Sequence, residues 1–354
     1  MPVYKDKKRK TYYFEGSYVD LLGNNKRYKR RGFKTSKEAK DAERLFLLEI
    51  KDKNRLSLTL DDIANEYFSY AESRIKMSSI ITFKYRYELH IKPYFSSKKI
   101  DKITPNDIIK WQKELINKNY STKYIQSIHE LFNRFYTFAG TIYGLNYNPL
   151  KIVGRAKNQK KNTPKMNVWE IDEFNKFMSV IEDPVDQCLF RLLYMTGMRK
   201  GECVVLQWKD YDGYTIQINK TYSKISKEIT YPKTDNSIRK LDLDTKTCEM
   251  LNNYLKICKA YDGYSDDKYI FGFYKPYSFT TLKRHKDLYI EKAGVKYIRI
   301  HDFRHSHASI LITKGIPITA VAERIGDTVE TVMNVYAHLM KESHEKIKNL
   351  LNEI

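Results

Sequence analysis

The sequence is short of acidic residues, of cysteine and of long apolar runs, and each shortage excludes a class of protein. Its only four cysteines (Cys188, Cys203, Cys248 and Cys258) stand far apart without a CxxC pair. We therefore expect reduced, buried thiols rather than a disulfide framework or a zinc site. No apolar run approaches the length of a membrane span, and the lysine-rich start lacks the apolar stretch of a signal peptide, so we expect a soluble, cytoplasmic protein.

Positive charge is what the sequence has in excess. Its 354 residues include 64 Lys and Arg against 43 Asp and Glu, a formal net charge of +21. Nucleic acid and anionic membrane surfaces are the usual partners of so basic a protein. Twenty-nine tyrosines suit a surface that contacts phosphate, although composition does not distinguish DNA from RNA. The 42% hydrophobic content is ordinary for a globular protein and argues against wholesale disorder.

The first forty residues are the most basic part, with thirteen Lys and Arg against four Asp and Glu. Alternation and turn residues predict strands over 11–20 and 26–34 around Gly23-Asn24-Asn25, then a helix from about Ser36 to Lys51. Such a sheet can place basic side chains in a groove of duplex DNA. A basic tail that adds only non-specific affinity is the alternative. We expect a folded N-terminal domain over 1–55.

Residues 58–150 have the pattern of a helical domain. Thr59-x-x-Asp62 and Thr104-Pro105-Asn106-Asp107 are capping-box patterns that begin helices. Apolar residues follow at helical spacing and indicate a core rather than a binding site: Ile108, Trp111, Leu115, Ile125, Ile128, Leu131, Phe132, Phe135 and Phe138.

A linker over 151–166 separates this region from a last domain over 167–354. The segment from Arg155 to Lys165 holds five basic residues, one proline and almost nothing apolar, which is typical of a hinge. The last domain begins with an Asn167-x-x-Glu170 cap. Two helices follow, then a hairpin-like β stretch from Thr215 to Leu243, then helices to the end. We find no internal repeat and no glycine-rich phosphate loop.

The first unusual segment of this domain runs from Thr196 through Gly197 and Arg199 to Glu202. The glycine ends a helix, so Arg199 is predicted at the N-terminus of the next one, where backbone N–H groups favour an anion. A guanidinium there can bind two phosphate oxygens at once. A surface cap with a salt bridge to Glu202 is the alternative.

The second segment is His301-Asp302-Phe303-Arg304-His305-Ser306-His307. On a helix, His301 and Arg304 share one face and can meet the same phosphate. Three histidines in seven residues also suggest a metal site, but the spacing is not that of HExxH, and no Cys or carboxylate stands at a familiar distance. The third segment is Gly326-Asp327, followed nine residues later by Tyr336.

These three segments, in this order, resemble the tyrosine recombinases, the phage-integrase family of site-specific DNA recombinases, over 167–354. The resemblance implies that Arg199, His301 and Arg304 are site residues and that Tyr336 is the nucleophile. The family also has a lysine in a β-turn between the two arginines. Pro232-Lys233-Thr234 is similar to that turn, so Lys233 takes its place. Where the family usually has His or Trp, this chain has Asp327, which when ionised can accept a hydrogen bond but cannot donate a proton.

The resemblance also implies the fold class: mixed and mainly α, with a small N-terminal β-sheet plus helix, a helical SAM-like core-binding domain and an α+β tyrosine-recombinase catalytic domain. The N-terminal domain would bind arm-type sites, and the other two would clamp the core-type site on double-stranded DNA. The resemblance further implies a homotetramer on synapsed DNA, with an excisionase or a DNA-bending host factor as accessory partner. The element moved would be a phage or a genomic island.

Phosphodiester exchange needs a nucleophile, neutralisation of developing charge and a proton for the departing oxygen. A phenol ionises near pH ~10, so Tyr336 needs help to lose its proton. Arg199 and Arg304 would stabilise the charge, His301 would act as acid or base, and Lys233 would protonate the 5′ oxygen. The resemblance implies a 3′-phosphotyrosyl intermediate that conserves the bond energy, so neither ATP nor a metal cofactor is expected.

Two questions stay open at this point. The apolar residues Ile347, Leu350, Leu351 and Ile354 predict an amphipathic last helix that packs either on its own domain or on a neighbouring protomer. Three other functions also compete: a non-catalytic DNA-binding regulator, a type IB topoisomerase and an RNA-binding protein. The first has no need of Tyr336 beside two arginines, the second has no need of an arm-like module, and the third explains only the charge.

Overall fold

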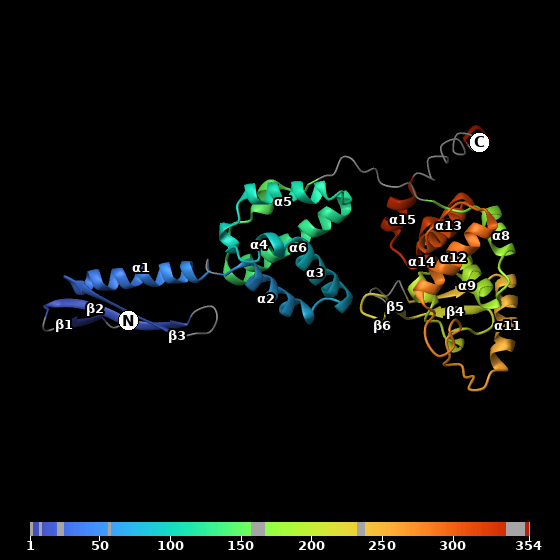
Figure 1. Cartoon of the computed structure of the whole chain (residues 1–354), viewed down its shortest axis with the longest axis horizontal. Coiled ribbons are helices and arrows are strands. Elements are labelled where there is room, and N and C mark those ends of the chain that lie inside the picture. Colours follow the sequence, from blue (N-terminus) through green and yellow to red (C-terminus); the bar gives the residue numbers. More distant parts are fainter. Residues whose placement is uncertain are drawn as a thin grey trace. The chain divides into compact units, whose positions relative to one another are not determined.

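The computed structural model describes residues 3–6, 9–19, 25–55, 58–156, 167–231, 238–337 and 351–353. The chain divides into two compact units, Met1–Thr163 and Pro164–Ile354. Figure 1 shows a β-sheet module and a helical bundle in the first unit and a helix-rich second unit. The expected fold class, mixed and mainly α with small sheets, is confirmed.

The N-terminal module is an antiparallel sheet in the order β1 (Val3–Asp6), β2 (Thr11–Val19) and β3 (Asn25–Phe33), followed by α1 (Ser36–Arg55). The two longer strands and the helix were predicted. The short β1 was not, because its pairing with β2 across the sheet is no local signal. Gly23 and Asn24 of the predicted turn lie outside the described residues.

Phe14 fixes the inner face of this sheet. Its ring is fully buried, 5.4 Å from the ring of Phe33 and 6.1 Å from that of Phe46 on α1. Seven of the nine residues of β3 are exposed, and they include all five of its Lys and Arg residues. The sheet is therefore held from one side only, and its basic side chains stay available on the other.

The rest of the first unit is helical. It comprises α2 (Leu60–Glu72), α3 (Met77–His90), α4 (Lys92–Phe95), a 3₁₀ turn (Ile100–Lys102), α5 (Pro105–Asn117), α6 (Thr122–Tyr143) and α7 (Pro149–Val153). Both predicted capping boxes are present: Thr59 and Thr104 each accept from the backbone N–H three residues on, and Asp62 and Asp107 bond back. The predicted apolar residues form the core of this bundle, with Phe138 packed at its margin.

The second unit begins with α8 (Ile171–Ser179), α9 (Pro184–Thr196), α10 (Lys200–Cys203) and a 3₁₀ turn (Trp208–Asp210). Four strands follow: β4 (Thr215–Ile218), β5 (Thr221–Ser223), β6 (Glu228–Thr230) and β7 (Arg239–Asp242). The last elements before the C-terminal region are α11 (Thr245–Lys259), α12 (Phe279–Ala293), α13 (Ile300–Thr313), α14 (Ile318–Ile325) and α15 (Val329–Tyr336).

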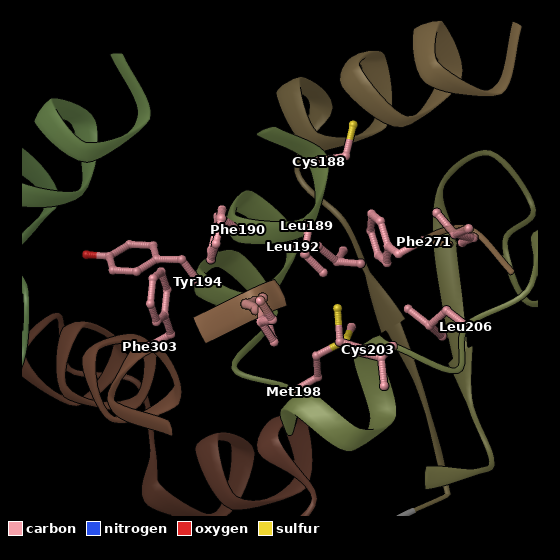
Figure 2. Close-up of a cluster of buried hydrophobic side chains, with 14 of the residues drawn as sticks. Cys188, Leu189, Phe190, Leu192, Tyr194, Met198, Cys203, Leu206, Phe271 and Phe303 are labelled. Carbon is pink, nitrogen blue, oxygen red and sulfur yellow. The ribbon is translucent and has the colours of Figure 1, made fainter. Parts of the chain in front are cut away.

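The second unit is built around a core to which α9 contributes most of its length. Figure 2 shows Phe190 and Tyr194 of α9 near Phe303 of α13, whose ring stacks on Phe190 at 5.9 Å. Met198 and Cys203 of the following turn are also buried in this cluster. A smaller cluster joins α13, α14 and α15. Consequently the segment around residue 199 and the segment around residue 336 are each anchored by burial.

Two local predictions for this unit are wrong. Glu170, not Asn167, caps α8, because Glu170 and Glu173 form the capping box and the Asn167 amide donates instead to the carbonyl of Tyr297, at 3.4 Å. The hairpin-like stretch is two sheets: β4 pairs with β7, and β5 pairs with β6 between them. Alternate residues of β4 and β7 are buried against the core, whereas β6 of the β5–β6 hairpin has no buried residue. This difference in burial distinguishes the two sheets.

Some predictions fall outside the described residues. These are Lys233 with its turn, most of the linker over 151–166, and Ile347, Leu350 and Ile354 of the last helix, of which only 351–353 are described as helical. All four cysteines are free and buried, as expected. In the described part of the chain, no helix has the length and apolar character needed to cross a bilayer.

Candidate active site

The turn between α9 and α10 presents Arg199. Gly197 ends α9 at φ 63°, in the left-handed region that glycine tolerates. A Cβ at this position would also lie 2.7 Å from the ring of His307, so no other residue fits. Arg199 then occupies the N-cap of α10, as predicted.

Arg199 reaches across to the turn after α14. Its guanidinium donates to the Gly326 carbonyl at 2.9 Å and to Asp327 Oδ2 at 3.3 Å, while its other nitrogen contacts Glu202 Oε1 at 3.0 Å. The salt bridge to Glu202, considered above as an alternative to an anion site, therefore exists beside it. The side chain of Arg199 is 35% exposed, so a ligand can reach it.

Arg304 approaches the same carboxylate from α13. Its guanidinium donates to Asp327 Oδ2 at 2.8 Å, to the Gly197 carbonyl at 3.1 Å and to the Ile325 carbonyl. Burial and the nearby Arg199 lower the pKa of Arg304 to about 10, which still leaves it charged at neutral pH. One carboxylate oxygen thus joins two guanidinium groups that would otherwise repel each other.

A buried ion pair supports Arg199 from below. Arg239 of β7 contacts Glu202 Oε2 at 2.9 Å, and both side chains are nearly inaccessible. Burial alone would raise the pKa of Glu202, but Arg239 and then Arg199 lower it overall, so this carboxylate stays ionised. Gly326, at φ 66°, leaves room for Arg239, whose Nη1 would lie 2.6 Å from a Cβ there. Glu202, which Arg239 holds in position, therefore fixes the guanidinium of Arg199 through their ion pair.

Histidines of α13 lie beside the tyrosine of α15. The Tyr336 hydroxyl is 2.7 Å from Nδ1 of His305, and the ring of His301 packs edge-on against that of His305, with centroids 4.8 Å apart. Tyr336 is only 3% exposed. Burial raises the pKa of the Tyr336 hydroxyl. The charge of Arg304 partly offsets this increase, and the charge of Asp327 adds to it. The charges of Arg304 and Asp327 thus act on Tyr336, whose hydroxyl needs a proton acceptor before it can attack.

His305 has the properties of that acceptor. Burial lowers the pKa of His305, and burial together with the charge of Arg304 lowers the pKa of His301, so both rings are neutral at pH 7. His307, the third histidine, is elsewhere: its Nε2 accepts from Arg324 Nε at 3.1 Å, and burial lowers its pKa to about 3. Its role is packing beneath Gly197.

The structure thus brings together five of the six predicted site residues, namely Arg199, His301, Arg304, Asp327 and Tyr336. Lys233 lies outside the described residues. The sequence reasoning missed two contributors, His305 and the Glu202–Arg239 pair. A signal for His305 was present, because on a helix it shares one face with His301 and Arg304.

Metal binding has no support in the geometry. Within the described ranges, no three His, Cys, Asp or Glu side chains are grouped so that they could hold a metal ion. Of the three histidines of α13, His301 and His305 pack on each other, whereas His307 is bonded to Arg324.

Known proteins resemble this chain along most of its length. Sequence models match for the phage integrase family over residues 167–343, for the phage integrase N-terminal SAM-like domain over 59–116, and for an arm DNA-binding domain over 2–50. The ICEBs1 integrase of Bacillus subtilis (strain 168) is 32% identical over 348 residues, which are 90% of this chain and 91% of that protein.

Solved structures share the fold. The Tn1549 transposon integrase bound to transposon right-end DNA matches 83% of this chain and 100% of its own, with a TM-score of 0.70 at 18% identity. A lambda integrase tetramer on a Holliday junction matches 93% of this chain and 96% of its own, with a TM-score of 0.59 at 17% identity. The chain therefore belongs to the phage integrase family and is a tyrosine-type site-specific DNA recombinase.

Proposed function

We propose that this protein cleaves and rejoins duplex DNA through a covalent bond between Tyr336 and a 3′ phosphate. The Tyr336 oxygen attacks the scissile phosphorus while its proton passes to His305, and the bond to the 5′ oxygen breaks. Arg199 and Arg304 neutralise the charge that develops on the non-bridging oxygens. Attack by a 5′ hydroxyl of a partner strand then reverses the step and releases Tyr336.

One observation carries this proposal: a buried tyrosine hydroxyl lies 2.7 Å from a neutral imidazole and feels the charge of Arg304, which shares one carboxylate oxygen with Arg199. The two guanidinium groups that share Asp327 Oδ2 would bind the phosphate oxygens with their remaining N–H groups when DNA is bound. The carboxylate is an acceptor only, so its role is to hold Arg199 and Arg304 together rather than to transfer a proton.

His301 and Lys233 complete the set. His301, whose ring packs on His305, orients that base and can itself contact a phosphate oxygen. Lys233 is assigned the proton for the departing 5′ oxygen on the resemblance of its turn alone. With the phosphotyrosyl bond conserving the energy of the broken one, the reaction needs no ATP and no metal.

The chain's layout supports a division of labour on DNA. We assign residues 1–55 to an arm-type DNA-binding domain, 58–150 to a core-binding domain, 151–166 to a linker and 167–354 to the catalytic domain. The three family models, in the same order along the chain, support this assignment. The lambda integrase tetramer on a Holliday junction supports a homotetramer on synapsed sites.

The biological role proposed is integration or excision of a mobile element in the cytoplasm, on the nucleoid. The similarity to the ICEBs1 integrase over nine-tenths of both chains supports this role rather than a type IB topoisomerase or a non-catalytic regulator. An excisionase or a DNA-bending host factor would set the direction, since one active site serves both.

Trapping the intermediate tests this function. A nicked suicide duplex that carries the attachment site is incubated with the protein in EDTA, and the products are separated under denaturing conditions. We expect a protein–DNA adduct whose released strand has a free 5′ hydroxyl that polynucleotide kinase can label. A requirement for magnesium, or attachment to the 5′ side, would exclude the proposed chemistry.

Replacing His305 by asparagine is predicted to lower the cleavage rate by about 10²–10⁴-fold. An asparagine keeps a polar group near the Tyr336 hydroxyl but cannot take up a proton. The wild-type rate should fall only when the pH drops through the lowered pKa of His305, because a neutral ring is needed, and it should be flat above that point. Single-turnover cleavage between pH 4.5 and 8 measures both, and a variant with the same acidic limb as wild type would show that another group is the base.

The neutral variant Asp327→Asn is predicted to destabilise the protein more than it slows cleavage. The buried Arg304 keeps a polar partner but loses its counter-charge, so the free energy of unfolding should fall by about 1–3 kcal/mol. Cleavage should fall by less than about tenfold, because the carboxylate donates no proton. Denaturant unfolding and suicide-substrate kinetics give the two values, and a loss of cleavage as deep as that of a Tyr336 variant would assign Asp327 a direct step.

A further inference from the structure

A second concave site lies in the same unit, remote from the active site. It is a cavity of about 570 Å³ between the start of α9, the end of α11 and the loop before α12. Its walls are mainly aromatic: Tyr254, Tyr261, Phe273, Tyr274 and Tyr277. Cavities of this size and lining are typical of ligand sites, and recombination chemistry makes no use of this one.

The cavity and the active site are at opposite ends of α9. Asp183, in the cavity wall, caps the first turn of that helix, and Gly197 ends it just before Arg199. Thirteen helical residues separate the two by about 20 Å. A ligand in the cavity therefore cannot touch the phosphate held by Arg199.

Two carboxylates lie beside the rings, and one of them, Asp183, accepts a backbone hydrogen bond from Val185 at 2.8 Å. Asp183 and Asp262 line the cavity, and in the part of the chain that the structure describes neither takes part in an ion pair. Neighbouring carboxylates have side-chain partners: Asp267 forms an ion pair with Lys209 at 2.7 Å, and Asp186 is hydrogen-bonded to His285 at 2.6 Å. In a protein of net charge +21, two unpaired acids beside aromatic rings would repel DNA and attract a cation.

Two of the aromatic residues, Phe273 and Tyr277, are held by contacts within the chain. Phe273 adopts φ 56°, a conformation rare for a bulky residue, and its carbonyl accepts from the Tyr269 N–H at 3.0 Å. Gly272 before it has φ 97°, and a Cβ there would lie 2.3 Å from the Lys275 carbonyl. On the opposite wall, the Tyr277 hydroxyl donates to the buried Asp186 at 2.9 Å. A preformed wall lowers the entropic cost of binding.

One cation already uses these rings. The Lys268 ammonium lies 4.3 Å from the centroid of Tyr274 and 5.6 Å from that of Phe273. Tyr274 nevertheless remains 72% exposed and Tyr261 59% exposed, so ring surface is still open to a second cationic group. The contact with Lys268 shows that a cation can reach the electron-rich faces of Phe273 and Tyr274.

We propose that this cavity binds an arginine side chain presented by a protein partner. The planar guanidinium can stack on a tyrosine while its N–H groups reach Asp183 or Asp262, a pair of interactions that a lysine ammonium matches less well. Charge complementarity selects the class of partner. A basic polypeptide is attracted to this wall, whereas a nucleic-acid strand, which could also stack on tyrosines, is repelled by the two carboxylates.

The test uses the full-length protein without DNA and a short blocked peptide, acetyl-Gly-Arg-Gly-amide. Its citrulline analogue has the same shape but no charge. Saturation-transfer NMR titrations should show saturable, millimolar binding of the arginine peptide and none of the citrulline peptide. Asp262→Asn and Tyr274→Ala should each weaken the arginine peptide by roughly five-fold, a typical value for one exposed cation–π or ionic contact.

The control is Tyr214→Ala, which removes an equally exposed tyrosine (77%) of the same unit outside the cavity and should bind like wild type. Thermal unfolding and suicide-substrate cleavage should be unchanged in all three variants. Equal binding of the two peptides, unchanged binding in both cavity variants, or displacement of the arginine peptide by a short oligothymidylate would overturn the proposal.

Discussion

Tyr336→Phe is expected to abolish the covalent adduct altogether. The substitution removes one oxygen from a buried ring, and that oxygen is the atom proposed to bond to phosphorus. No neighbouring group can replace it, because the only hydroxyl described within hydrogen-bond distance of His305 Nδ1 is that of Tyr336. DNA binding should persist, since Arg199 and Arg304 keep their partners. Gel shifts and suicide-substrate assays on one preparation measure the two properties.

Tyr194→Phe is the matched control. Tyr194 is also buried in the second unit and also loses one hydrogen bond, to the Trp169 carbonyl at 3.1 Å, but it lies in the core. It should form adduct at close to the wild-type rate. An adduct that persists in Tyr336→Phe at wild-type yield would assign the nucleophile to another residue.

Arg304→Gln is expected to show the second-largest effect, a loss of cleavage on the order of 10³–10⁵-fold, as for arginines that stabilise a transferring phosphoryl group. The glutamine cannot carry the charge that Arg304 brings to the phosphate. It also leaves Asp327 and two backbone carbonyls with weaker partners, so stability should fall by about 3–5 kcal/mol. Single-turnover cleavage and urea unfolding give both numbers.

Arg191→Gln is the control that distinguishes a loss of stability from a loss of cleavage. Arg191 is as buried as Arg304 and pairs with Asp244 at 2.5 Å, but it serves the α9–α11 packing. This control should lose comparable stability and keep cleavage, measured below its unfolding transition. Equal losses of cleavage in the two variants would mean that Arg304 acts through stability alone.

Local patterns explain which parts of the fold were predictable. The capping boxes at Thr59 and Thr104 depend on contacts three residues apart, and both formed as expected. The pattern Asn167-x-x-Glu170 is also typical of a helix cap, yet the amide of Asn167 bonds to Tyr297, 130 positions away. The strand β1 likewise exists through its pairing with β2. Interactions that decide such cases are absent from the local sequence.

The site shows the same division. Gly197 and Arg199 could be placed from the sequence because a helix end is a local event, and the helix of α13 put His301 and Arg304 on one face. Which histidine faces the nucleophile depends on how α15 packs on α13, and only the folded chain shows that it is His305. The position of Asp327 between two arginines could not be read from its sequence neighbours either, since it joins three separate segments.

The most direct test of the account is to locate the bond itself. The adduct formed on the suicide substrate is digested with trypsin and nuclease, and the peptide that keeps a nucleotide is sequenced by mass spectrometry. The chain has 29 tyrosines, and the account predicts modification of one, Tyr336, through a 3′ phosphate. A nucleotide on any other tyrosine, or on a serine, would contradict it.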